Sequence, residues 1–281
     1  MQLDEGPDQE VEAHAQQGED GDEPEDFHGP DGTAPAAELP GTVPGVEPLR
    51  RPPITFAHRG GRGHGPDNTI ETFQRGLELG ATGLETDAWL TADGVVVLDH
   101  DGSLRRRLRR RRMATLRRDE LPVSIPSLAE LYAACGTGFE LSVDVRDPRT
   151  GPAVIEVARE ADPGAPKHLW LCHHDWKRLA QWREAFPDVR LVNSTRLRDI
   201  GEGAERRAAE LARTGVDAIN LHYTDWSGGL TALFHRFERL AFGWDAQYER
   251  VLRELLRVGI DGIYSDHVDR MVAVVGLGRK G

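Results

Sequence analysis

The sequence has few cysteines, no long hydrophobic run, and no lysine or arginine in its first 49 residues. Cys135 and Cys172 are the only cysteines, and two cysteines cannot form the disulfide framework of a small secreted domain. No run of 18 apolar residues exists, so we expect no membrane-spanning helix. The amino terminus lacks a basic segment followed by an apolar one and does not resemble a secretory signal. These absences predict a soluble cytoplasmic protein.

The first 49 residues differ in composition from the rest. They contain 14 Asp and Glu, seven Gly and seven Pro, with too few large apolar side chains to offset the entropy of folding. We therefore predict a disordered acidic tail over residues 1–49 and a folded domain over residues 50–281. The chain carries 47 acidic and 35 basic residues, which leaves 33 acidic and 35 basic residues, or +2, in the domain. A nearly neutral domain gives no reason to expect nucleic-acid binding.

Hydrophobic runs rich in β-forming residues alternate with helical patterns along the domain. Thr69, Ser127 and Asp175 each precede such a helical pattern and can cap its first turn. Eight runs separated by seven helical segments, with a short closing helix near 266–275, predict an α/β fold, a (β/α)8 TIM barrel. The expected strands are 54–58, 83–88, 139–145, 168–172, 189–193, 217–221, 240–244 and 261–264.

Two of these expected strands end in residues with carboxylate side chains. Glu85 and Asp87 lie two positions apart and so point to the same face, and Asp144 ends the next expected strand. Three converging carboxylates in a cleft cannot all stay ionised without a cation between them. Ligation by oxygen alone favours a hard ion, so we expect a divalent metal, Mg²⁺ or Ca²⁺.

The segment 91–101 is too short after the second strand to cross over to a parallel neighbour, so it predicts a β-hairpin. A loop at Asp93-Gly94 places residue 87 opposite residue 100, and a loop at 92–93 places residue 85 there. Either register sets His100 on the face of the carboxylates, whereas a slip of one residue turns it away. His58, at the end of the first strand, then flanks the same acidic site.

Five segments of the domain carry a family resemblance: AHRGGRGHGPDNTIETF, GLETDAWLTADGVVVLDHD, IPSLAELY, LSVDVR and GIDGIYSDHVD. They resemble the glycerophosphodiester phosphodiesterase family, in the family's order and across residues 54–269. The resemblance implies a TIM barrel that hydrolyses glycerophosphodiesters, such as deacylated phospholipids, with a divalent metal. It also implies roles for particular residues: His58 and His100 as the acid–base pair, Glu85, Asp87 and Asp144 as metal ligands, Arg59 as a phosphate ligand, and Trp244 as a wall of the substrate pocket.

The chain departs from the family pattern in three places. Asp67 replaces the usual glutamate before the asparagine, and Asp144 with Arg146 replaces the usual Glu and Lys. A shorter carboxylate bears on metal preference, while Arg146 offers phosphate two donors where lysine offers one charge. After His100, where the family usually has a longer segment that shapes the substrate pocket, this chain has a compact arginine-rich loop at 105–112.

The arginine-rich loop leaves three interpretations open: a rim that attracts anionic headgroups or substrates, a docking site for the acidic tail, or a solvated loop. Lipid contact would then be peripheral. For the whole protein, two alternatives to the main hypothesis also stay open. One is lysophospholipase D activity on lysophospholipids, and the other is a barrel that binds phosphodiesters or lipids without catalysis.

Overall fold

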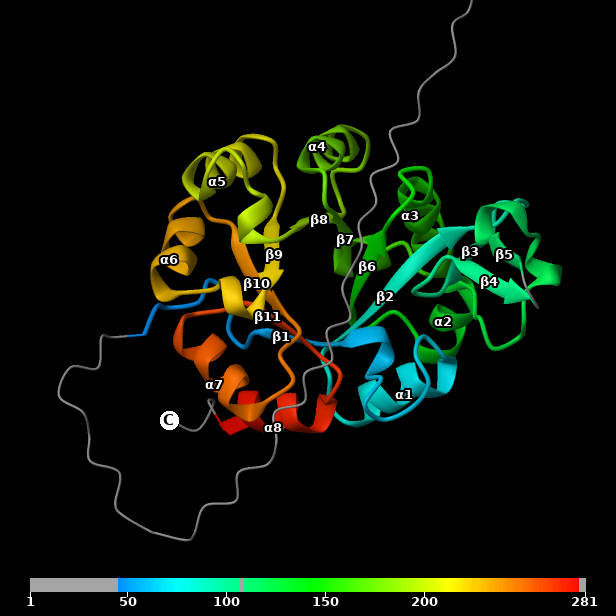
Figure 1. Cartoon of the computed structure of the whole chain (residues 1–281), viewed down its shortest axis with the longest axis horizontal. Helices are drawn as coiled ribbons and strands as arrows, with labels where there is room; N and C mark the ends of the chain where they lie inside the picture. The colour runs from blue at the N-terminus through cyan, green and yellow to red at the C-terminus, as the bar shows by residue number, and fades with distance from the viewer. Residues whose placement is uncertain (1–44, 107–108, 278–281) are drawn as a thin grey trace, which may run out of the picture. The chain divides into compact units, whose positions relative to one another are not determined.

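A computed structural model describes residues 45–106 and 109–277. Eight parallel strands form a closed barrel with the helices around it (Figure 1), and the barrel closes because β1 pairs with both β11 and β2. The barrel strands are β1 (Ile54–Ala57), β2 (Gly83–Leu90), β6 (Glu140–Val145), β7 (Leu169–His173), β8 (Arg190–Ser194), β9 (Ala218–His222), β10 (Leu240–Trp244) and β11 (Gly262–Ser265). The helices are α1 (Ile70–Glu78), α2 (Leu128–Cys135), α3 (Thr150–Ala161), α4 (Trp176–Ala185), α5 (Ala204–Arg213), α6 (Gly228–Arg236), α7 (Glu249–Arg257) and α8 (Val268–Leu277).

The predicted TIM barrel is confirmed, and each predicted strand overlaps a strand of the barrel. The predicted disordered tail lies outside the described residues up to position 44. Residues 45–49, which composition assigned to the tail, are described, and Val46 approaches Gly259 so closely that a Cβ there would clash. None of the described helices is both long and apolar enough to cross a bilayer.

Large side chains fill the inside of the barrel. Phe56 and Tyr264 stack with ring centroids 4.5 Å apart, and Trp170 meets Phe242 edge to face at 5.1 Å. These rings belong to a buried cluster contributed by alternate residues of the strands, as the two-residue period of a strand requires. Since the interior is packed, an open site can form only at an end of the barrel.

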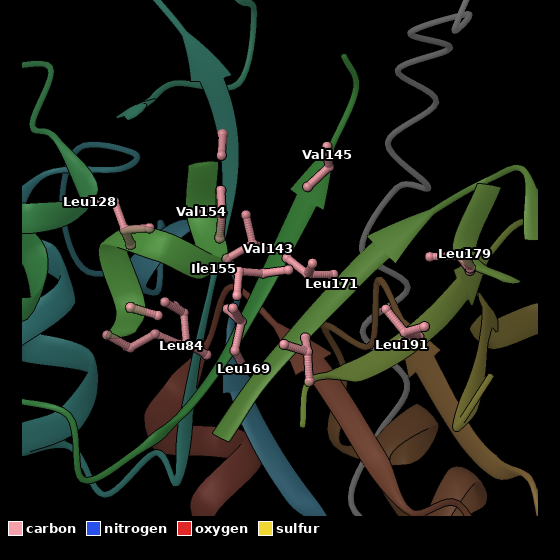
Figure 2. Close-up of a cluster of buried hydrophobic side chains, with 14 of the residues drawn as sticks. Leu84, Leu128, Val143, Val145, Val154, Ile155, Leu169, Leu171, Leu179 and Leu191 are labelled. Atoms are coloured by element: carbon pink, nitrogen blue, oxygen red, sulfur yellow. The ribbon is translucent and has the colours of Figure 1, made fainter. Parts of the chain in front are cut away.

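A second apolar layer joins the strands to the surrounding helices. Figure 2 shows Leu84, Val143 and Leu171 of the strands close to helical residues such as Leu128 and Ile155. The helices begin where the sequence predicts. Thr69, Ser127 and Asp175 cap α1, α2 and α4 with side-chain oxygens that accept from backbone N–H groups, which satisfies donors that a helix start leaves unpaired.

The hairpin after β2 has a different register from either predicted one. β3 (Val96–Leu98) pairs with β2 so that Leu90 lies opposite Val96. The Thr91 N–H also donates to the Val95 carbonyl at 3.0 Å, which leaves a loop of three residues, 92–94. Gly94 adopts φ +82° and its N–H donates to the Thr91 carbonyl, which is the geometry of a type I turn followed by a left-handed residue. Both predicted two-residue loops were therefore wrong, because Gly94 is a third loop residue and does not pair with β2.

The arginine-rich segment was expected to be a loop, and this expectation was wrong. It forms a two-stranded antiparallel ribbon, β4 (Ser103–Arg106) and β5 (Arg109–Arg112). Leu104 anchors the ribbon by packing against a small cluster that includes Met113 and Leu116. Besides this apolar contact and the ladder hydrogen bonds, Arg111 Nη1 pairs with Glu120 Oε1 at 3.1 Å and ties the ribbon to the segment that follows it.

Candidate active site

The chain turns sharply where β1 ends, and this turn places two cationic side chains at the barrel mouth. His58 and Arg59 begin a short 3-10 segment in which Arg59 has φ 49°, a left-handed conformation that costs free energy for a residue with a Cβ. The Arg59 N–H donates to Glu85 Oε2 at 2.8 Å, and the Arg59 carbonyl accepts from Asn68 N–H at 3.0 Å. The Gly61 N–H donates to the His58 carbonyl at 2.8 Å. These bonds hold the turn in place.

His58 lies between two carboxylates. Its Nδ1 is 2.6 Å from Asp266 Oδ1, and its Nε2 is 3.8 Å from Glu85 Oε2. Because an ionised carboxylate can only accept, Nδ1 donates to Asp266 and Nε2 faces the site. Burial lowers the pKa of His58, but the negative charges of Glu85 and Asp266 outweigh burial and raise that pKa.

Asp266 is a site residue that the sequence analysis missed. It follows β11, the last strand of the barrel, and so occupies the same kind of position as the predicted strand-end residues. Burial raises the pKa of Asp266, yet its hydrogen bond to His58 and the nearby charges of His58 and Arg62 lower that pKa overall. The signal was present in the segment GIYSDHVD, since the rule that strand ends form the site applies to the eighth strand too.

The three predicted metal ligands converge. One carboxylate oxygen from each of Glu85, Asp87 and Asp144 lies within 4.8 Å of the others, and no further cluster of this kind occurs among the described residues. Glu85 and Asp87 are buried, and Asp87 is the direct neighbour of Asp144 across the β2–β6 pair. Burial raises the pKa of all three carboxyl groups, most strongly that of Asp87, where the Glu85 and Asp144 charges add to the effect.

This donor set fits a divalent cation. Burial is the largest cause of the raised pKa values, and repulsion between the carboxylates adds to it for Glu85 and Asp87. A cation between the three groups would offset both effects. Oxygen ligands without nitrogen or sulfur favour Mg²⁺ or Ca²⁺.

Two guanidinium groups border the acidic cluster. Arg59 Nε is 3.8 Å from Asp87 Oδ2, and Arg146 Nη2 is 3.6 Å from Asp87 Oδ1. Asp67 accepts from Arg59 Nη1 at 3.0 Å and so fixes the guanidinium plane, while Arg59 Nε is buried without a hydrogen bond. A buried donor without a partner beside a second guanidinium suits the binding of an anion such as phosphate.

His100 reaches the barrel mouth, although the predicted register that placed it there was wrong. Asp87 lies opposite Asp99, whose N–H donates to the Asp87 carbonyl at 3.1 Å. β3 ends at Leu98, so the alternation of strand faces no longer governs His100. Burial and the nearby guanidiniums of Arg59 and Arg146 lower the pKa of His100, against an opposing effect of Asp101. Its Nδ1 is 2.9 Å from Asp101 Oδ1.

Trp244 ends β10 on the same side of the barrel as the other strand-end residues. Its ring meets His222 edge to face at 4.5 Å, and the guanidinium of Arg196 lies 5.6 Å from its centroid. His222 Nε2 is in turn 3.1 Å from Asp245 Oδ2. The tryptophan therefore has a fixed orientation among polar groups, as a pocket wall requires.

Comparison with known proteins finds similarity to the family that the sequence motifs resemble. Residues 58–132 match the model of the glycerophosphoryl diester phosphodiesterase family. An uncharacterized protein, YqiK, of Bacillus subtilis is 51% identical over 51 residues, which are 18% of this chain and 21% of that protein. A glycerophosphodiester phosphodiesterase of Bacillus altitudinis is 23% identical over 78% of this chain and 96% of its own. The solved structure of an Oleispira antarctica phosphodiesterase, in complex with the product sn-glycerol-3-phosphate, has a TM-score of 0.70 at 18% identity and covers 80% of this chain and 97% of its own.

Proposed function

We propose that the chain is a phosphoric diester hydrolase of the glycerophosphoryl diester phosphodiesterase family, whose model its residues 58–132 match, and that it hydrolyses glycerophosphodiesters to glycerol 3-phosphate and an alcohol. One observation carries the proposal most strongly. Three carboxylates, two histidines and two arginines, from three strand ends and a hairpin, meet at one end of the barrel. A packing role explains none of these charged groups, because each would have a lower free energy in solvent than in a buried site.

In this proposal Glu85, Asp87 and Asp144 hold a divalent cation, Mg²⁺ or Ca²⁺. When bound there, the cation would act as a Lewis acid that offsets negative charge on the phosphoryl oxygens. Asp144 is the ligand that distinguishes this chain from the usual family pattern, and it is the least buried of the three.

Arg59 and Arg146 bind the phosphate. A phosphodiester carries one negative charge, and hydrolysis develops more charge on its equatorial oxygens. Arg59 is restrained by Asp67 and by its own backbone hydrogen bonds, so its guanidinium is positioned before substrate arrives. Preorganised donors of this kind need no rearrangement during reaction.

His58 and His100 move the protons. The attacking oxygen must lose a proton and the leaving alcohol must gain one, and imidazole titrates near neutral pH. Each histidine has one ring nitrogen paired with an aspartate, Asp266 for His58 and Asp101 for His100. The other nitrogen of each ring is then left to exchange protons with substrate. Trp244 forms a wall of the pocket that receives the substrate's organic part.

The test is an assay of alcohol release from glycerophosphocholine by the full chain, with and without EDTA. We expect turnover in the presence of Mg²⁺ or Ca²⁺, loss of turnover with chelator, and loss in Glu85→Gln. Glutamine keeps an oxygen that accepts from the Arg59 N–H, so the turn stays intact while the charge is removed.

Glu140→Gln is the matched control. Glu140 begins β6, at the opposite end of the barrel from the site, where it accepts from Trp170 Nε1 at 2.6 Å. It should keep full metal-dependent turnover. Full activity of Glu85→Gln, or of the wild-type chain in excess chelator, would falsify the proposed metal dependence.

A further inference from the structure

The arginine ribbon, β4 and β5, has two chemically different faces. Residues directly opposite one another in an antiparallel pair share a face, and Arg105 lies opposite Arg110 while Ser103 lies opposite Arg112. These four residues therefore form one face, with Arg105, Arg110 and Arg112 all exposed. The other face carries Leu104, which packs inward, and Arg111, which pairs with Glu120 at 3.1 Å.

The three arginines of the outer face are poorly neutralised. Within the described part of the chain, the side chains of Arg105 and Arg112 contact no carboxylate at ion-pair distance. Arg110 Nη2 lies 3.8 Å from Asp101 Oδ2, and both side chains are more than 60% exposed. Like charges placed directly opposite on a sheet are destabilising, so this face is arranged for an anionic partner rather than for stability of the fold.

The position of the ribbon limits what that partner can be. Arg110 pairs with Asp101, and Asp101 pairs with His100, so the ribbon stands beside the mouth of the barrel. A surface with many phosphates matches a row of guanidiniums better than one small anion does. Proteins that bind single-stranded nucleic acid also need aromatic side chains for base stacking, and the outer face has none among its described residues.

We propose that the outer face of the arginine ribbon binds the surface of an anionic lipid bilayer and holds the barrel mouth close to it. The attraction is electrostatic, so it needs anionic lipid and weakens with salt. Each arginine near such a surface strengthens binding by about fivefold, so three together contribute roughly 100-fold.

The test measures sedimentation of the full chain with vesicles of pure phosphatidylcholine and with vesicles containing one part phosphatidylglycerol to three parts phosphatidylcholine. We expect binding only to the second kind at low salt, and release in 0.5 M NaCl. The triple variant Arg105→Gln, Arg110→Gln, Arg112→Gln should bind roughly 100-fold more weakly than the wild-type chain. Its melting temperature, measured in parallel, should stay that of the wild type because all three side chains are exposed.

A matched control removes three arginines at the other end of the barrel. Arg213, Arg236 and Arg257 are the last residues of α5, α6 and α7, are more than 60% exposed, and each pairs with a surface glutamate. Changing all three to Gln alters the net charge by the same amount. This control should bind vesicles within about twofold of the wild type, since each charge lies far from the membrane-facing end.

Two outcomes would overturn the proposal. In one, both triple variants lose vesicle binding equally, which would mean that net charge alone drives it. In the other, the ribbon variant binds anionic vesicles as the wild type does but loses binding to a single-stranded oligonucleotide, which would assign the ribbon to nucleic acid. Neither measurement uses substrate, so the result is independent of the proposed hydrolysis.

Discussion

At the scale of single residues, the site depends on pairs that fix side chains before substrate binds. His58 shows this most clearly, because Asp266 holds its Nδ1 at 2.6 Å and leaves Nε2 facing the carboxylates. Arg59 is held in the same way by Asp67 and by Glu85, which accepts from its N–H. Histidine and arginine thus have few accessible orientations, which reduces the entropy lost on reaching the transition state.

Asp266→Asn tests the positioning of His58. Asparagine is nearly the same size but brings no charge, so we expect kcat to fall about 10- to 100-fold, as for other groups that orient a catalytic side chain. KM should change little, because Asp266 contacts the histidine rather than substrate. Asp269→Asn is the control, since this nearby aspartate contacts His64 instead. Unchanged kcat in Asp266→Asn would remove Asp266 from the mechanism.

The two histidines are predicted to act in one transition state. His58→Ala and His100→Ala should each lose about 10²- to 10⁴-fold in rate, and the double variant should lose less than the product of the two. A diester with a p-nitrophenolate leaving group needs little protonation. It should therefore rescue the variant that lacks the general acid and not the one that lacks the base. Near-normal activity of both single variants on every diester would contradict acid–base catalysis by this pair.

At the scale of elements, the excursion after β2 decides where His100 lies. The turn 91–95 is built from side chain as well as backbone: Thr91 Oγ1 donates to Asp93 at 2.7 Å and accepts from the Val95 N–H at 2.9 Å. The turn sets the register of β3, and the end of β3 sets where the chain bends toward the mouth. The same excursion continues into the arginine ribbon.

Gly94→Ala tests the turn. No atom lies within 4 Å of the added Cβ, so the cost is conformational and arises from φ +82°. We expect a loss of about 1 kcal/mol, or roughly 2–4 °C in melting temperature for a domain of this size. Gly138→Ala, also in open space but without a positive φ, should be neutral or slightly stabilising. Equal melting temperatures for the two variants would show that the left-handed residue does not restrain the hairpin.

At the scale of the whole molecule, the acidic cluster links cation binding to stability. Burial raises the pKa values of Glu85, Asp87 and Asp144, and the charges of neighbouring carboxylates raise those of Glu85 and Asp87 further. The cation-free fold therefore bears an electrostatic cost at neutral pH. The unfolded chain cannot bring the three carboxylates together. A cation therefore binds the folded state preferentially and stabilises it.

Titration with Mg²⁺ or Ca²⁺ should accordingly raise the melting temperature. At 100 times the dissociation constant the gain is about 2.7 kcal/mol, which is roughly 5–10 °C for a domain of this size. Glu85→Gln should lose most of this shift and Glu140→Gln should keep it. The same shift in both variants would place the cation elsewhere on the protein.

The sequence alone determined the barrel, its strands, and the residues at the strand ends. This was possible because strand periodicity and strand order are local properties, and a closed parallel barrel brings all carboxyl ends to one side. Glu85, Asp87 and Asp144 therefore converge as predicted. The acidic cluster could be inferred from spacing without any knowledge of packing.

Tertiary structure alone decided the contacts between distant segments. Asp266 lies 208 residues from His58 in the chain, and no local pattern says which strand-end carboxylate will face a given imidazole. The hairpin register depended on whether Gly94 would close the turn, and alternation failed for His100 because β3 ends before it. The two faces of the arginine ribbon likewise follow from cross-strand pairing, since a run of identical residues has no periodicity from which a register could be read.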